Sequence, residues 1–195
     1  MAFWRGFKTW ANEIVHDVRS EMNLTPYQAL DPRALARHVD IDIIEMSDFV
    51  VTAPAIAHLS DVEPEVFSAV TVFRGKERLI VHNDTHAPVR QNSNLAHEIS
   101  HGLLQHPPTP ALDARGCRNW NQDIEDEASW LAGALLIPEA ATLAIARGGI
   151  SLTAAAAHFD VSEQMVQFRL NATGAVRRIQ RANQSREGNF ARTGR

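Results

Sequence analysis

The chain has 195 residues, of which 45% are hydrophobic, which is typical of one domain that buries a substantial core. The formal net charge is −4, and the single cysteine excludes an internal disulfide framework and favours a reducing compartment. No apolar run is long enough to span a bilayer, and residues 1–10 lack a secretory signal, so we expect a cytoplasmic protein with no membrane partner.

The first third of the chain predicts two helices and a short strand. Apolar residues at helical spacing predict an amphipathic helix over 7–22. A second helix is expected over 32–39, because Asp31 is a favourable N-cap and proline suits the first helical turn. Residues 41–46 alternate apolar and polar side chains, which indicates a short strand.

The next segment predicts a β-hairpin. Residues 66–74 are rich in β-branched and aromatic side chains, Gly75 and Lys76 suit a turn, and the apolar residues 79–81 follow. Helices are expected before and after these strands in the sequence. This order of elements predicts an α+β fold with a small antiparallel sheet.

The second half of the chain is expected to be mostly helical. Pro107 and Pro108 end its first helix, and a loop rich in Pro, Arg and Asp follows up to residue 121. The helix ranges predicted from apolar spacing and from breaker residues are 91–106, 123–137, 139–147, 152–159, 163–170 and 175–182.

The helix expected over 91–106 contains an H-E-x-x-H motif, His97-Glu98-Ile99-Ser100-His101. Histidines four residues apart lie within about 40° of each other on a helix, so both imidazoles can bind one metal ion. The apolar Leu95 and Ile99 lie on the opposite side and can pack on a core. Glu98 is then placed to act on a water molecule at the metal, as in zinc-dependent peptidases.

Catalytic zinc usually takes three protein ligands, and the third is expected from the helix over 123–137. Glu125 shares its face with small residues, Ser129 among them, which allow this helix to approach the histidines closely. Glu127 points nearly the opposite way and is the fallback ligand, or else a solvated carboxylate. Ser129 could also hydrogen-bond a ligating histidine. The predicted ligands of one zinc ion are therefore His97, His101 and Glu125.

Two segments resemble the ImmA/IrrE-type metallo-endopeptidases, which carry an A-H-E-x-x-H helix and then E-x-x-A-N-x-F-A-x-x-L-L-M-P. The matching segments are Ala96–His101 and Glu125–Pro138, and the likeness extends over most of residues 25–172. The resemblance implies a zincin-like fold, a zinc ion and Glu125 as the third ligand. It also implies an endopeptidase of narrow specificity that cleaves a helix-turn-helix repressor and so relieves repression.

Four positions depart from the residues that are usual in that family, and none of them is a predicted ligand. Ser93 stands where the family has Phe, Ser100 where it has Gly, Ser129 where it has Asn, and Leu131 where it has Phe. Of these four, the serine in place of asparagine at position 129 has the largest effect on the interpretation, because it weakens the expectation of a hydrogen bond to a ligating histidine.

Three parts of the chain are expected to differ in role. A zincin-like metallopeptidase domain is expected over 1–150, a helical hairpin that resembles a helix-turn-helix over 151–182, and a basic, disordered tail over 183–195. Residues 169–195 contain seven arginines and one acid, so this end of the chain could contact phosphates.

The predicted reaction is peptide hydrolysis. Glu98 would act as the general base and then as the general acid toward the leaving amine. The peptide could add as a strand to an edge of the sheet over 66–81. The developing oxyanion needs a second electrophile, for which the sequence does not choose among Tyr27, His82, His86, Arg90 and His106.

Two other functions stay open. The chain could be a DNA-binding regulator that uses residues 152–182, in which Ser162 caps the second helix of the hairpin. It could instead bind a repressor without cutting it. Cys117 lies in the loop between the two helices that carry the ligands, where it could cap the zinc as a thiolate, although a free loop cysteine is the simpler interpretation.

Overall fold

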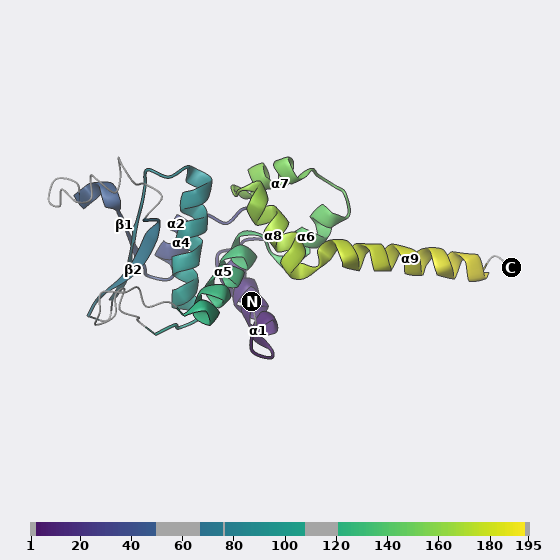
Figure 1. Cartoon of the computed structure of the whole chain (residues 1–195), viewed down its shortest axis with the longest axis horizontal. Coiled ribbons are helices and arrows are strands. Elements are labelled where there is room, and N and C mark those ends of the chain that lie inside the picture. Colours follow the sequence, from purple (N-terminus) through teal and green to yellow (C-terminus); the bar gives the residue numbers. More distant parts are fainter. Residues whose placement is uncertain (1–2, 50–66, 76, 108–120, 194–195) are drawn as a thin grey trace.

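Helix α4 (Pro88–Leu103) lies at the centre of the fold, between a three-stranded sheet and helix α5 (Gln122–Leu136) (Figure 1). The structure is a computed structural model that describes residues 3–49, 67–75, 77–107 and 121–193, with side chains described as far as Ser185. The other elements are α1 (Phe7–Glu21), α2 (Pro32–His38), β1 (Asp42–Glu45), the 3-10 helix η1 (Met46–Phe49), β2 (Ala69–Arg74), β3 (Glu77–His82), α6 (Glu139–Ala146), α7 (Leu152–Phe159), α8 (Glu163–Thr173) and α9 (Ala175–Thr193).

The sheet has the order β1-β3-β2, with β3 in the middle. β2 and β3 form the predicted antiparallel hairpin, in which Thr71 lies opposite Ile80. β1 pairs with β3 in parallel, with Ile43 opposite Ile80, so the sheet is mixed and the expectation of a wholly antiparallel sheet was wrong. A parallel neighbour requires a long connection, and the chain between β1 and β2 supplies one. The α+β class is confirmed.

The main core lies between α1, α2, α4 and α5. Phe7 of α1 and Leu35 of α2 are fully buried against Leu95 and Ile99 of α4 and Leu131 of α5. Leu95 and Ile99 are the residues that the helical spacing placed opposite the two histidines. One side of α4 is thus held by the core, which leaves its other side to carry functional groups.

The C-terminal helices pack against α5, and the turn between α7 and α8 contacts α4. Asp160, in the turn between α7 and α8, adopts the left-handed conformation with φ 52°. The Asn92 side chain of α4 donates to the Asp160 carbonyl at 3.1 Å and to its carboxylate at 2.9 Å. Ser162 caps α8, as predicted, by accepting a hydrogen bond from the Met165 amide.

Helix α9 projects away from the rest of the molecule (Figure 1). Its backbone is helical from Ala175 to Thr193, so the predicted helix over 175–182 is too short. Among the described helices, none alone is both long and apolar enough to cross a membrane, and α5 with α6 meets that test only as a pair bent by 65°.

Two buried arginines donate hydrogen bonds to the carboxyl end of α5. Arg19 of α1 donates to the Leu135 carbonyl at 2.8 Å, and Arg169 of α8 donates to the Ile137 carbonyl at 3.0 Å. Carbonyls at a helix end lack partners within the helix and carry the negative end of its dipole, so positive donors stabilise them. These contacts fix the end of α5 that is remote from Glu125.

Gly133→Ala is expected to lower the free energy of unfolding by about 1–2 kcal/mol, because overpacking outweighs the gain in helix propensity. A Cβ atom at this position would lie 2.8 Å from Cδ of the buried Arg169 and 3.1 Å from Phe168. Urea unfolding measures the change. Gly149→Ala is the matched control, since the nearest atom to its Cβ would lie 3.8 Å away. Equal losses in the two variants would contradict the packing argument.

Candidate metal centre

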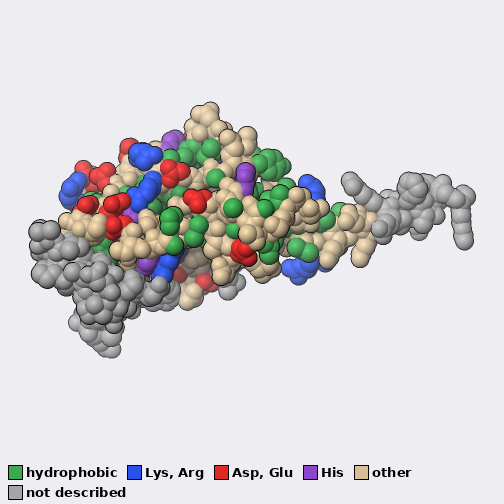
Figure 2. Space-filling view, turned by 90° about the horizontal axis from the view of Figure 1, so that it is seen from above, with side chains coloured by type: hydrophobic (Ala, Val, Ile, Leu, Met, Phe, Trp, Pro, Cys, Tyr) green, Lys and Arg blue, Asp and Glu red, His purple; other side chains and the backbone are tan. Residues whose placement is uncertain are grey.

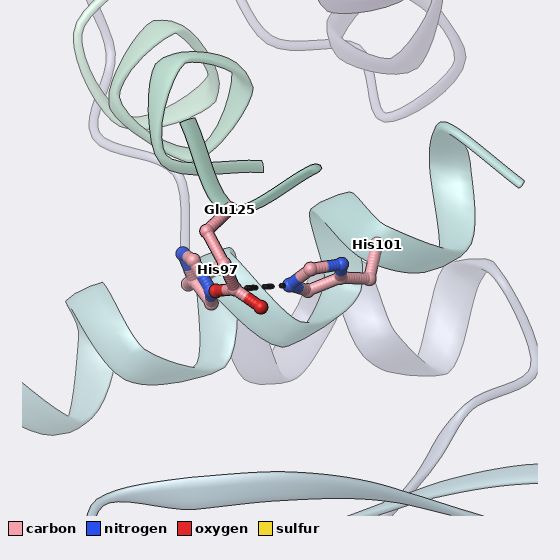
Figure 3. Close-up of side chains that lie close together, drawn as sticks. All are labelled: His97, His101 and Glu125. Carbon is pink, nitrogen blue, oxygen red and sulfur yellow. Dashed lines mark hydrogen bonds and ion pairs between the residues drawn. The ribbon is translucent and has the colours of Figure 1, made fainter. Parts of the chain in front are cut away.

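Two histidines of α4 and one glutamate of α5 point toward one another (Figure 3). The His97 Nε2 atom lies 3.1 Å from the Glu125 Oε2 atom, and the His101 Nε2 atom lies 3.7 Å from the same oxygen. The two Nε2 atoms are 3.1 Å apart. The sequence reasoning named these three residues, and the structure brings them together.

The spacing of these three atoms fits one divalent metal ion. Ligands held tetrahedrally at about 2.1 Å from zinc lie roughly 3.4 Å from one another, and the three separations scatter around that value. Hydrogen bonds from Nε2 of His101 and of His97 hold the pKa of the Glu125 carboxyl well below its usual value, and a bound metal ion would take the place of those Nε2 protons. Two imidazoles and one carboxylate are a donor set that zinc accepts.

The close approach of α5 to α4 depends on small side chains. Ala128 is fully buried and Ala132 is 2% exposed, on the same face of α5 as Glu125. On α4, Ser100 is also fully buried, and its hydroxyl donates to the Ala96 carbonyl at 2.7 Å. The serine that departs from the family's usual glycine therefore satisfies its own hydroxyl within the helix.

The first histidine has a hydrogen-bond partner behind it. The Ser129 hydroxyl lies 3.3 Å from the His97 Nδ1 atom. When Nδ1 carries the ring proton and donates it to this hydroxyl, Nε2 is left with a free lone pair toward the cluster. Ser129, which stands where the family has asparagine, is thus placed to hydrogen-bond His97 despite this replacement.

The second histidine is connected to a carboxylate through another histidine. The His101 Nδ1 atom lies 2.9 Å from the His106 Nδ1 atom, and the His106 Nε2 atom lies 3.2 Å from Glu127 Oε2. Glu127 accepts only, so His106 donates to it from Nε2 and accepts from His101 at Nδ1. His101 then has its lone pair on Nε2, as metal binding requires. Burial lowers the pKa of His106, which keeps it neutral and able to accept.

This connection gives His106 and Glu127 a different role from the ones expected. His106 was a candidate for the oxyanion and Glu127 was the fallback ligand, whereas the structure places both behind His101. Glu127 is 17% exposed, so it is not a solvated carboxylate. The chain turns back after α4 because Gln105 adopts φ 55°, and the His106 amide bonds to the His101 carbonyl at 3.0 Å.

His106→Ala is expected to weaken zinc binding by about 10–100-fold, the usual cost of losing a partner behind a ligating histidine. Competition with a zinc-binding dye measures the affinity. His38→Ala is the matched control, since it removes another histidine–glutamate pair, His38 with Glu21 at 2.8 Å, away from the cluster. Unchanged zinc affinity in His106→Ala would contradict the role assigned to this histidine.

The candidate base, Glu98, faces the edge strand β2. The Thr71 hydroxyl donates to the Glu98 Oε2 atom at 2.6 Å. Arg78 of β3 lies close enough for the two charges to interact. Burial lowers the pKa of Arg78, and the negative charge of Glu98 opposes that effect. Sequence reasoning missed both Thr71 and Arg78. The only indication in the sequence was their place on the hairpin strands, and the register of the hairpin against α4 cannot be read from the strands alone.

The other predicted oxyanion candidates make hydrogen bonds to residues outside the three-residue cluster. Tyr27 is 54% exposed, and its carbonyl accepts from His158 of α7. Arg90 donates to the Ser68 hydroxyl at 3.2 Å. His82 and His86 are buried at the end of β3 and in the following loop, where the His82 Nε2 atom lies 3.2 Å from Arg33. Cys117 falls outside the described residues, so the proposed thiolate cap stays a prediction.

Comparison with known proteins identifies a family. A family model described as the IrrE N-terminal-like domain, which belongs to a group of peptidases, matches residues 36–171. This match covers more than two thirds of the chain and includes α4 and α5 in full. No curated protein and no solved structure matches the chain significantly.

Proposed function

The chain belongs to the peptidase family described as the IrrE N-terminal-like domain, and we propose that it is a zinc-dependent endopeptidase of narrow specificity. One observation carries this proposal most. His97, His101 and Glu125 converge within 4.8 Å on one side of α4. Glu98, the residue after the first histidine, lies on the same helix and is held toward the strand where a peptide could bind.

The chain's own residues would provide proton transfer and orientation. When bound, zinc supplies a lowered pKa for water and polarisation of the scissile carbonyl. Glu98 takes the proton of the attacking water and passes it to the leaving amine. Thr71 donates to one carboxylate oxygen of Glu98, which leaves the other oxygen to accept that proton.

A peptide substrate would bind along β2. This strand lies at the edge of the sheet, since β3 pairs on one side of it and no described strand pairs on the other. Val72 and Phe73 are 40% and 38% exposed, so this edge offers apolar side chains as well as main-chain groups. An added strand would run beside Thr71, whose hydroxyl donates to Glu98.

We further propose that the substrate is a helix-turn-helix repressor, and this step rests on the resemblance to the ImmA/IrrE-type enzymes. The test is incubation of the zinc-loaded protein with repressors encoded beside it, followed by mass spectrometry of the fragments. A single cut by the wild-type protein and none by Glu98→Gln supports the proposal. A protein that binds the repressor and releases it intact would instead be the non-cleaving binder.

A DNA-binding role for the α7–α8 pair is less well supported. Arg169, which the sequence placed in the basic segment, is fully buried and bonds to α5. The exposed residues Glu163, Gln164 and Gln167 of α8 are acidic or neutral. The exposed, described cations of this end are Arg177, Arg178 and Arg181 of α9. Figure 2 shows Lys and Arg side chains where the projecting part leaves the rest of the molecule. A mobility-shift assay at several salt concentrations tests this role, because phosphate contacts give a steep salt dependence.

A further inference from the structure

We infer that a pocket between α4 and α8 is a subsite for one large apolar side chain of the peptide, close to the bond that is cut. The pocket has a volume of about 450 Å³, and its walls include Val89 and Ser93 of α4 and Met165 and Phe168 of α8. This inference rests on the proposed peptidase function and names the substrate feature that the site would select.

The pocket continues the face of α4 that carries the metal ligands. Arg90 and Ser93, which both line it, lie within about 40° of His97 around the helix axis. Ser93 is one turn before His97, a rise of about 6 Å, and Arg90 is about two turns before it. A bound strand advances about 3.3 Å per residue, so the pocket is within reach of a side chain one to three positions from the scissile bond.

The edge strand β2 and helix α5 both lie next to residues that line this pocket. Arg90 donates to the hydroxyl of Ser68, the residue before β2, so a peptide lying along β2 would reach the pocket at that end. On the other side, a Cβ atom at Gly133 would lie 3.1 Å from Phe168 and 3.4 Å from the Met165 sulfur. The pocket wall on α8 therefore touches the face of α5 that bears Ser129, one turn before Gly133.

The chemistry of the walls favours an apolar guest. Val89, Met165 and Phe168 provide aliphatic, thioether and aromatic surface, and an unbranched thioether adapts to guests of different shape. The Ser93 hydroxyl already donates to the Val89 carbonyl at 3.1 Å, and the Ser162 hydroxyl is engaged by the Met165 amide. A leucine, methionine or phenylalanine side chain would be buried here without leaving these hydroxyls unpaired.

The small side chain at position 93 leaves this space open. A phenylalanine in place of Ser93 would project from the same face of α4 into the pocket. Ser93→Phe therefore tests the subsite by filling it, and Met165→Ala tests it by enlarging it.

The experiment measures binding separately from cleavage. The zinc-loaded Glu98→Gln protein, which is expected not to cut, is mixed with random decapeptides, and the retained peptides are sequenced by mass spectrometry. We expect Leu, Met and Phe to be enriched at one position by at least about fivefold. Adding Ser93→Phe should abolish that enrichment, whereas adding Met165→Ala should shift it toward Trp. Gln167→Phe, on the exposed side of α8, is the matched control and should leave the profile unchanged.

The outcomes separate this inference from the proposed function. An apolar preference that Ser93→Phe and Met165→Ala both leave unaltered would overturn the subsite, even if the wild-type protein cleaves peptides. Absence of any preference in the zinc-loaded protein would also overturn it. Conversely, a preference that follows these substitutions supports the subsite even if the wild-type protein cuts nothing, in which case the peptidase function alone fails.

Discussion

Glu98→Gln is expected to lower the rate of peptide hydrolysis by about 10²–10⁴-fold, the usual contribution of a positioned general base, while zinc binding is retained. The carboxamide keeps the size of the side chain and can still accept from Thr71, but it cannot take a proton from water. Steady-state cleavage of a fluorogenic peptide measures the rate, and metal analysis of the same sample measures zinc.

The matched control for this variant is Glu77→Gln. Glu77 is an exposed carboxylate on the neighbouring strand β3, and it pairs with Arg74 rather than with the cluster. Its substitution should leave the rate within about twofold. Hydrolysis by Glu98→Gln at the wild-type rate would remove Glu98 from the reaction and leave the peptidase proposal without a base.

Glu125→Ala is expected to weaken zinc binding by more than about 100-fold. This loss is larger than the one expected when a residue that only hydrogen-bonds a ligand, such as His106, is removed. The substitution removes the carboxylate on which both imidazoles converge, and with it the only ligand that comes from α5. Titration with zinc against a competing chelator measures the affinity, and cleavage should be lost in parallel.

Asp123→Ala is the control for the zinc measurement. Asp123 is an exposed acid in the first turn of the same helix, so its loss changes the net charge by the same amount without touching the cluster. Zinc affinities that fall equally in the two variants would indicate a general electrostatic effect. That result would contradict Glu125 as a ligand.

The ligand cluster could be predicted because its information is local. His97 and His101 are one helical turn apart, and the choice of Glu125 over Glu127 follows from which face of the next helix carries small residues. Both inferences need only the helical period. The structure shows the three residues together. The family model that matches the chain agrees with the family whose motifs contain these residues.

The parts that could not be predicted depend on contacts between distant segments. The parallel pairing of β1 with β3 cannot be inferred from the alternation of apolar and polar residues in either strand. Arg169 was counted in the basic segment that could contact phosphates, whereas it is fully buried, because a single arginine in a helix does not reveal which face packs. His106 was placed at the end of the helix predicted over 91–106 and among the oxyanion candidates, whereas α4 ends at Leu103 and the left-handed turn at Gln105 brings His106 back to His101.

The hydrogen bonds that connect His101 through His106 to Glu127 affect the balance of charge at the metal site. A dication at the three ligands would be offset by one negative charge in direct contact, on Glu125, and by a second on Glu127 that acts through two neutral rings. The nearer carboxylate alone would leave a surplus positive charge in a half-buried place. With both, and with the charge of Glu98 offset by the nearby Arg78, the total comes close to zero, so the arrangement is matched to an ion of charge two rather than one.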